Sequence, residues 1–325
     1  MSETVYLPIN PPAEPAVPLP HPELTDGEKQ MQQEVQKHFE DPAYTPSAEK
    51  PLMDVEKMWL SYECILRYLR ASKWKVDVAI QRLEATLKWR REYGMYETVP
   101  ADVEPEAVTG KEIPLGFDVH GRPALYLIPS RQNTTESTQQ IQFNVWMLER
   151  CIDLMPPGVE SLDLLINYAD KAKNPSFGTA RAVLNILQDH YPERLGLALI
   201  LNVPWLLNTF FKLITPFVDP VTRNKMKFNP QVIEDGIFSP DMVMAQWWGG
   251  SYKFEYEHDK YWPALIALCE ERTKAWTATW QKLGGKVGLK EFDYKRGHLE
   301  HTEAAPSVPA PEGADSVPAP EGAES

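Results

Sequence analysis

Cysteine is scarce in this 325-residue chain. Cys64, Cys151 and Cys269 lie far apart, each in an apolar or helix-like segment, and none belongs to a CxxC pair. Disulfide-stapled domains and thiolate metal sites need closely spaced cysteines. The pattern therefore argues against both and predicts buried free thiols in a reducing compartment.

Long hydrophobic runs are also missing. The longest, Leu195 to Leu207, is interrupted by Asn202 and Pro204 and falls short of the roughly 20 residues that a transmembrane helix needs. The first residues, MSETVYLPINPP, have neither the basic nor the apolar region of a signal peptide. We therefore expect a cytoplasmic protein that meets membranes only at their surface.

The chain has no excess of positive charge. Its formal net charge is −13, and residues 1–23 and 300–325 together carry nine acidic residues and no Lys or Arg, which leaves about −4 for residues 24–299. Neutralising nucleic-acid phosphates requires a basic surface. We therefore expect no nucleic-acid partner.

Sequence motifs of common enzymes are missing too. There is no GxSxG, GxxxxGK(S/T), GxGxxG or HExxH motif. His298 and His301 are three residues apart, but they stand at the start of the acidic tail, where a solvated end is a simpler interpretation than a metal site. His120 and His190 have no motif partner for base catalysis, so we expect structural roles for them. The sequence thus predicts neither an enzyme nor a metal site.

Proline, by contrast, is abundant, with 30 residues concentrated toward the two ends. Residues 8–22 contain seven prolines, a composition that favours an extended, solvated backbone. The C-terminal end repeats SVPAPEGAD as SVPAPEGAE, and two such copies bury nothing. We predict a disordered arm at 1–23, inert or carrying a proline recognition motif, and a disordered acidic tail at 300–325.

Between the ends, two kinds of pattern follow one another. Apolar residues at helical spacing predict a small helical lobe at 24–100. ALYLI, LDLLINY and LALILNV are then short apolar runs separated by helix-like stretches. This alternation predicts an α/β domain with a mainly parallel sheet at 101–256. A C-terminal helix and extension should follow at 257–299.

The segment 205–217 is apolar nearly all round and has one charged residue. Such a helix fits a buried core position, but also a lid over an apolar cavity or an element that dips into a membrane. Glu193 and Arg194 precede the most apolar strand, and Lys225 follows this helix. Polar groups at both ends of an apolar wall are what an amphiphilic ligand requires, with surface salt bridges as the alternative.

Several stretches carry a family resemblance. CILRYLRASKWKVDVAIQRLEATLKWRREYG, and then DVHGRPALYLI, HYPERLGLALILNV, PFVDPVTRNKMKF and WWGG, follow one another at defined spacing. They resemble the CRAL-TRIO lipid-binding family, in the branch of fungal phosphatidylinositol transfer proteins. SRQN, MLERCIDLMPPG, YWPAL and GGKVGLKE are similar to its members linked to pleiotropic drug resistance. The resemblance covers residues 56–296 and implies an apolar lipid cavity between a sheet and helices.

The resemblance also implies a phosphatidylinositol site and a gate. The headgroup positions fall on Glu193, Lys225, Thr222, Lys73 and Ser72. At Ser72 the family pattern LRARK reads LRASK. Lys, Thr and Glu supply the cationic donors and oxygen acceptors that a phosphodiester and a hydroxylated ring require. The gate helix would carry Trp205, Leu206, Phe210, Phe211, Ile214 and Phe217.

A second ligand is implied as well. Leu162 and Leu164 stand on the strand where carriers of phosphatidylcholine present hydroxyl residues. Because an unpaired zwitterion in an apolar site is costly, this change favours sterol over phosphatidylcholine.

We therefore expect a lipid-transfer protein with no cofactor other than bound lipid, which supports lipid homeostasis and phosphoinositide synthesis. It would act at membranes such as the endoplasmic reticulum, lipid droplets or the cell periphery. The alternatives are a lipid-gated adaptor that presents phosphatidylinositol to a kinase and, less favoured, a lipid hydrolase.

Overall fold

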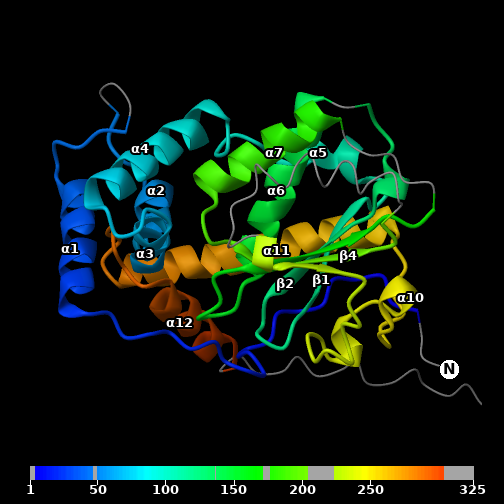
Figure 1. The fold of residues 1–325 in the computed structure, drawn as a ribbon. Helices are drawn as coiled ribbons and strands as arrows, with labels where there is room; N and C mark the ends of the chain where they lie inside the picture. Colours follow the sequence, from blue (N-terminus) through cyan, green and yellow to red (C-terminus); the bar gives the residue numbers. More distant parts are fainter. Residues whose placement is uncertain (1–3, 47–49, 136, 171–175, 204–222, 304–325) are drawn as a thin grey trace, which may run out of the picture.

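The computed structural model describes residues 4–46, 50–135, 137–170, 176–203 and 223–303. The predicted gate helix, Thr222 and the repeat of the acidic tail lie outside these residues. Figure 1 shows a helical lobe beside a larger lobe in which helices and a sheet pack together. Within the described residues, no helix is both long and apolar enough to cross a membrane.

The helical lobe contains α1 (Asp26–Glu40), α2 (Asp54–Trp59), α3 (Tyr62–Ala71) and α4 (Val76–Glu92). Thr25 and Ser61 cap α1 and α3, because their side-chain oxygens accept hydrogen bonds from backbone N–H groups of the first turn. The apolar faces of these helices share one core, and Val287, from far along the chain, is buried in it. The lobe is therefore completed by the C-terminal part of the chain.

The larger lobe is built on a five-stranded sheet in the order β1-β2-β3-β4-β5. The strands are β1 (Glu112–Phe117), β2 (Pro123–Leu127), β3 (Leu162–Asn167), β4 (Leu195–Leu201) and β5 (Met226–Phe228). β1 runs antiparallel to β2, and all other neighbours are parallel. The prediction of an α/β fold with a mainly parallel sheet is confirmed.

Two strands were not expected from the sequence. Pro114 and Gly116 interrupt the apolar pattern of β1, and an edge strand tolerates them because one side of it needs no partner. β5 has only three residues, too few for a recognisable pattern.

The remaining elements surround the sheet. They are α5 (Pro100–Ala107), η1 (Pro129–Arg131), α6 (Thr138–Leu154), α7 (Phe177–His190), η3 (Pro240–Met242), α10 (Ala245–Trp248), α11 (His258–Lys282) and α12 (Glu291–Glu303). In Figure 1, α6 and α7 lie on one side of the sheet and α10 on the other. α12 continues beyond residue 299, so the helix extends into the predicted tail. Cys64, Cys151 and Cys269 are buried free thiols.

The proline-rich arm makes specific contacts. Val5 donates its N–H to the Lys253 carbonyl at 2.9 Å, and its own carbonyl accepts from the Glu255 N–H at 3.0 Å. Val17 donates to the Val119 carbonyl at 2.8 Å. The prediction of a disordered arm is therefore corrected for residues 4–23. Proline lacks a backbone N–H, but the other residues of the arm still form backbone hydrogen bonds with loops of the sheet lobe.

Candidate functional site

One face of the sheet carries a continuous apolar surface. Residues paired across parallel strands point to the same face, and the register aligns two such rows. Leu125, Leu164, Ala198 and Met226 form one row, and Leu127, Ile166, Ile200 and Phe228 form the next. We call these eight residues the apolar wall. None of their side chains can donate a hydrogen bond, so the wall is chemically suited to hydrocarbon. Leu125, Ala198 and Ile200 are buried, whereas Phe228 at the sheet edge is 51% exposed.

The two residues predicted for a second ligand lie in different environments. Leu164 and its wall neighbour Ile166 are partly exposed, whereas Leu162 is 2% exposed and belongs to the main core. Tyr168, which follows β3, packs against Ile166 and Ile200. The apolar wall therefore includes Leu164, excludes Leu162, and has a hydroxyl-bearing residue as a neighbour.

The opposite face of the sheet is closed. The Tyr126 hydroxyl on that face accepts a hydrogen bond from the Met244 N–H at 3.2 Å. Its ring also meets the ring of Trp248 edge-on, with centroids 6.0 Å apart. The segment around α10 thus covers this face, and the apolar wall lies on the other one.

Charged residues gather where β4 begins. The Nε of Arg70, on α3, donates to Glu193 Oε2 at 2.6 Å, and its Nη2 lies 3.6 Å from Glu160 Oε2. The Nζ of Lys225 donates to the Leu195 carbonyl at 2.6 Å, two residues beyond Glu193. The structure thus places two predicted headgroup residues, Glu193 and Lys225, near the start of β4 and adds Arg70, which the sequence did not single out. We call Arg70, Glu193 and Lys225 the β4 cluster.

Ser72 and Lys73 lie just beyond the end of α3. Ser72 is 7% exposed, and its Oγ has no hydrogen-bond partner in the described part of the chain, whereas Lys73 is exposed. The φ angles of Lys73, Trp74 and Glu193 are 52°, 58° and 60°, in the left-handed region that side chains disfavour. Such strain persists only where the surrounding structure enforces it, and it is frequent at ligand sites.

The HYPER motif joins the two lobes. The His190 ring stacks on the Trp89 ring of α4, and its Nδ1 lies 3.0 Å from Thr86 Oγ1. The Tyr191 hydroxyl donates to Glu149 Oε1 at 2.6 Å. Burial lowers the pKa of His190 to about 4. The ring is therefore neutral near pH 7 and acts as a structural contact rather than as a poised base.

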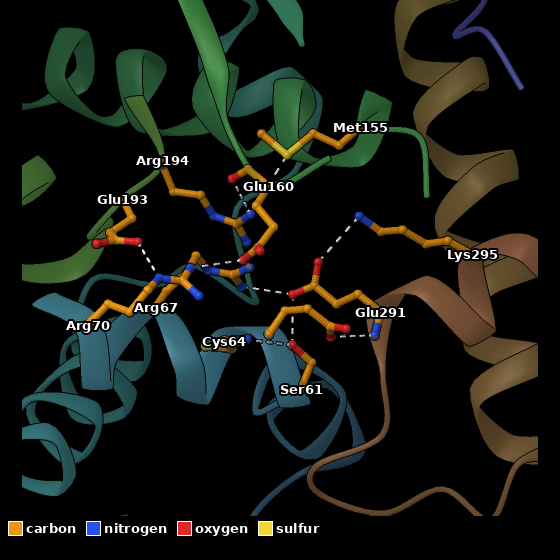
Figure 2. Close-up of polar contacts among 11 residues, drawn as sticks. Ser61, Cys64, Arg67, Arg70, Met155, Glu160, Glu193, Arg194, Glu291 and Lys295 are labelled. Atoms are coloured by element: carbon orange, nitrogen blue, oxygen red, sulfur yellow. Dashed lines mark hydrogen bonds and ion pairs between the residues drawn. The ribbon is translucent and has the colours of Figure 1, made fainter. Parts of the chain in front are cut away.

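A buried ion network adjoins the β4 cluster (Figure 2). Arg67 donates to Glu160 at 2.6 Å and to Glu291 at 2.8 Å, and Arg194 donates to the Glu160 carbonyl at 2.8 Å. Burial alone would raise the pKa of Glu291, but Arg67, Lys295 and Arg194 hold it well below its usual range. The network ties α3, the loop before β3 and α12 into one fixed arrangement.

A surface groove and possible metal ligands were the other candidate sites among the described residues. A surface groove of about 540 Å³ between α5 and α11 contains none of the predicted site residues, and its lining includes Val99, Glu104, His258, Trp262 and Ile266. Across the described ranges, no group of three His, Cys, Asp or Glu residues could hold a metal ion.

Comparison with known proteins agrees with this architecture. The chain matches the CRAL/TRIO domain over residues 107–242 and the CRAL/TRIO N-terminal domain over residues 31–85. The crystal structure of Sfh5 has a similar fold, with a TM-score of 0.54 at 17% identity, over 87% of this chain and 99% of that one.

Two fungal relatives show higher identity. A CRAL-TRIO domain-containing protein of Schizosaccharomyces pombe is 46% identical over 298 residues, which are 86% of this chain but only 29% of that protein. The phosphatidylinositol transfer protein PDR17 of Saccharomyces cerevisiae is 40% identical over 272 residues, which are 79% of this chain and 76% of PDR17. Three findings agree. Family models match both lobes, PDR17 is similar along most of its length, and the fold resembles that of Sfh5. The chain belongs to the CRAL/TRIO family.

Proposed function

We propose that the chain binds phosphatidylinositol and transfers it between membranes. One observation carries the proposal: the β4 cluster stands at the start of a strand whose other residues contribute to the apolar wall. A diacyl lipid with an anionic, hydroxyl-rich head requires this combination of charge and hydrocarbon surface. The relative PDR17, named as a phosphatidylinositol transfer protein, supports the same ligand.

The free energy of burying the acyl chains explains why a lipid carrier needs such an apolar wall. Two acyl chains contain about thirty methylenes, and burying each one contributes about 0.8 kcal/mol, so the carrier must replace about 25 kcal/mol that the bilayer provides. A polar or water-filled cleft could not compete. The apolar wall supplies one side of the required environment, and the predicted gate helix at 205–217 would supply a cover.

The headgroup roles follow from the chemistry of each side chain. Lys225 and Arg70 would donate to the phosphodiester, and Glu193 would accept from inositol hydroxyls. Ser72 is short and buried, so Arg70 would supply the guanidinium that the family pattern places at position 72. Thr222 and Lys73 would add a hydroxyl and a second ammonium.

A sterol is the second ligand that the apolar wall favours. The eight wall residues offer no partner for a choline phosphate, and an unpaired buried zwitterion costs several kcal/mol. A sterol has one hydroxyl and needs one partner, for which Tyr168, packed against the wall, is the candidate.

The rival functions find less support. A hydrolase needs a nucleophile beside an active base. The Thr86 hydroxyl contacts the His190 ring, but this hydroxyl is fully buried, and burial lowers the pKa of His190 to about 4. This pair therefore suits neither role. An adaptor that presents phosphatidylinositol to a kinase would need the same lipid site but no net transfer.

The experiment that separates these functions is a vesicle assay. Donor vesicles with labelled phosphatidylinositol are mixed with unlabelled acceptors and the purified chain. Faster movement of intact lipid supports transfer. Lipid bound without movement would favour the adaptor, and lipid breakdown products would identify a hydrolase.

A further inference from the structure

The GGKVGLKE segment at 284–291 has a buried side that joins the lobes. Val287 is 4% exposed in the core of the helical lobe, and the N–H of Gly288 donates to the Leu60 carbonyl at 2.8 Å. Gly288 has a φ of 77°, and a Cβ there would lie 2.2 Å from the side chain of Gln36. These contacts explain why the segment needs a glycine and an apolar residue, but they do not use its lysines.

The exposed side of the same loop is basic and carries one leucine. Residues 282–290 contain Lys282, Lys286 and Lys290 and no acidic residue. All three lysines are exposed, and Leu283 is 44% exposed. Throughout the ranges that the structure describes, none of the three lysines forms an ion pair. The Nζ of Lys290 lies 5.5 Å from the centre of the Tyr62 ring. The next acidic residue, Glu291, is turned inward onto Arg67.

The loop is held rigidly in this shape. The N–H of Leu283 donates to the Thr279 carbonyl at 3.0 Å, and the indole Nε1 of Trp280 donates to the Lys286 carbonyl at 3.2 Å. Gly284 and Gly285 have φ angles of 110° and 59°, which let the chain turn sharply after α11. A loop already fixed in its binding shape loses little conformational entropy on binding.

We propose that residues 282–290 bind the anionic surface of a membrane, with Leu283 entering the interface and the three lysines contacting anionic headgroups. Lysines beside an apolar side chain are the combination that such surfaces attract. The chain as a whole has a net charge of −13, which anionic membranes repel. A local basic loop therefore determines which face approaches the membrane. An acidic protein would attract the lysines equally but would gain little from one isolated leucine.

The test measures binding to vesicles without any transfer of lipid, so it is independent of the proposed cargo. The full chain is sedimented with phosphatidylcholine vesicles with and without phosphatidylserine, at low and high salt. The variants are the triple change Lys282→Gln, Lys286→Gln, Lys290→Gln and the single change Leu283→Gln. The matched control changes three exposed lysines elsewhere, Lys37, Lys88 and Lys274, to Gln.

We expect phosphatidylserine to strengthen binding of the unchanged chain and high salt to weaken it. The triple variant should bind about a hundredfold less tightly, because each Lys near an anionic surface contributes about fivefold. Leu283→Gln should bind vesicles about tenfold less tightly, because burying one leucine contributes about a factor of ten in affinity. The proposal is overturned if the control loses as much as the triple variant, or if phosphatidylserine has no effect, which would point to an acidic protein instead. Unchanged thermal unfolding of Leu283→Gln shows that its loss is not a folding defect.

Discussion

The imidazole ring of His190 lies flat on the indole ring of Trp89, with centroids 4.1 Å apart and planes 7° from parallel. Trp89 belongs to α4 in the helical lobe, and His190 is the last residue of α7 in the sheet lobe. The Tyr68 hydroxyl reinforces the joint by donating to the His190 carbonyl at 3.0 Å. The first residue of the HYPER motif therefore holds the lobes together, while its glutamate belongs to the β4 cluster.

This stack predicts a specific pH dependence of stability. Burial lowers the pKa of His190 to about 4, below its ordinary value of 6.5. The unfolded chain therefore takes up this proton first, and the stability that the neutral ring contributes at pH 7 is lost as the pH falls from 6.5 toward 4. Urea unfolding of the chain and of His190→Asn should show a shallower decline for the variant across this range. Equal slopes would contradict the prediction.

The buried network predicts an asymmetry between two ion pairs. Glu291→Gln leaves Arg67, only 2% exposed, without its full charge complement and should lower the free energy of unfolding by about 3–5 kcal/mol. Glu257→Gln breaks the exposed pair with Lys260 and should cost less than about 1 kcal/mol. Both are measured by urea unfolding at pH 7. A similar loss of unfolding free energy in the two variants would show that burial does not determine how much these ion pairs contribute to stability.

The β4 cluster predicts selective loss of phosphatidylinositol transfer. Arg70→Ala, Glu193→Ala and Lys225→Ala should each lower transfer about ten- to a hundredfold, because a charge-assisted contact contributes about 1.5–3 kcal/mol. Lys75→Ala, an exposed lysine close to α3, is the control and should transfer normally.

A rescue variant tests the role of Arg70 further. Adding Ser72→Arg to Arg70→Ala should restore part of the activity, because the guanidinium returns near the same end of α3. If Arg70→Ala slows sterol and phosphatidylinositol transfer alike, Arg70 only holds the lobes together.

The apolar wall predicts which residue selects the second ligand. Leu164→Thr places a hydroxyl on the partly exposed wall and should raise phosphatidylcholine exchange relative to sterol exchange. Leu162→Thr makes the same chemical change in the closed core, where it should cost about 2–4 kcal/mol of stability without altering selectivity. Both exchanges are measured side by side with labelled lipids. An equal shift in the two variants would remove Leu164 from the lipid site.

Local patterns account for what the sequence could predict. Strands β2 to β4 coincide with the three short apolar runs, and α7 coincides with the helix-like stretch between the second and the third. Burial of one face gives a strand or a helix a periodic pattern that is visible in the sequence. Arg67 and Arg70 are three residues apart on α3, a spacing that places them on one helix face and could have drawn attention to them.

The partners of those arginines could not be predicted in the same way. Arg67 meets Glu160 and Glu291, which lie 93 and 224 residues away along the chain. No local pattern records such a pairing, because tertiary packing alone brings these groups together. The proline-rich arm is similar: composition indicates its extended backbone but not the loops that it contacts.

The position of Val287 in the helical lobe has a consequence for how the chain is made. About nine-tenths of the protein must be synthesised before this residue can enter the core that α1, α3 and α4 begin. The five strands of the described sheet, by contrast, have all been synthesised once Phe228 has emerged. Domains usually fold in the order of synthesis. Here we expect the reverse: the lobe that leaves the ribosome first is the one that is finished last, closing onto a sheet that has already formed.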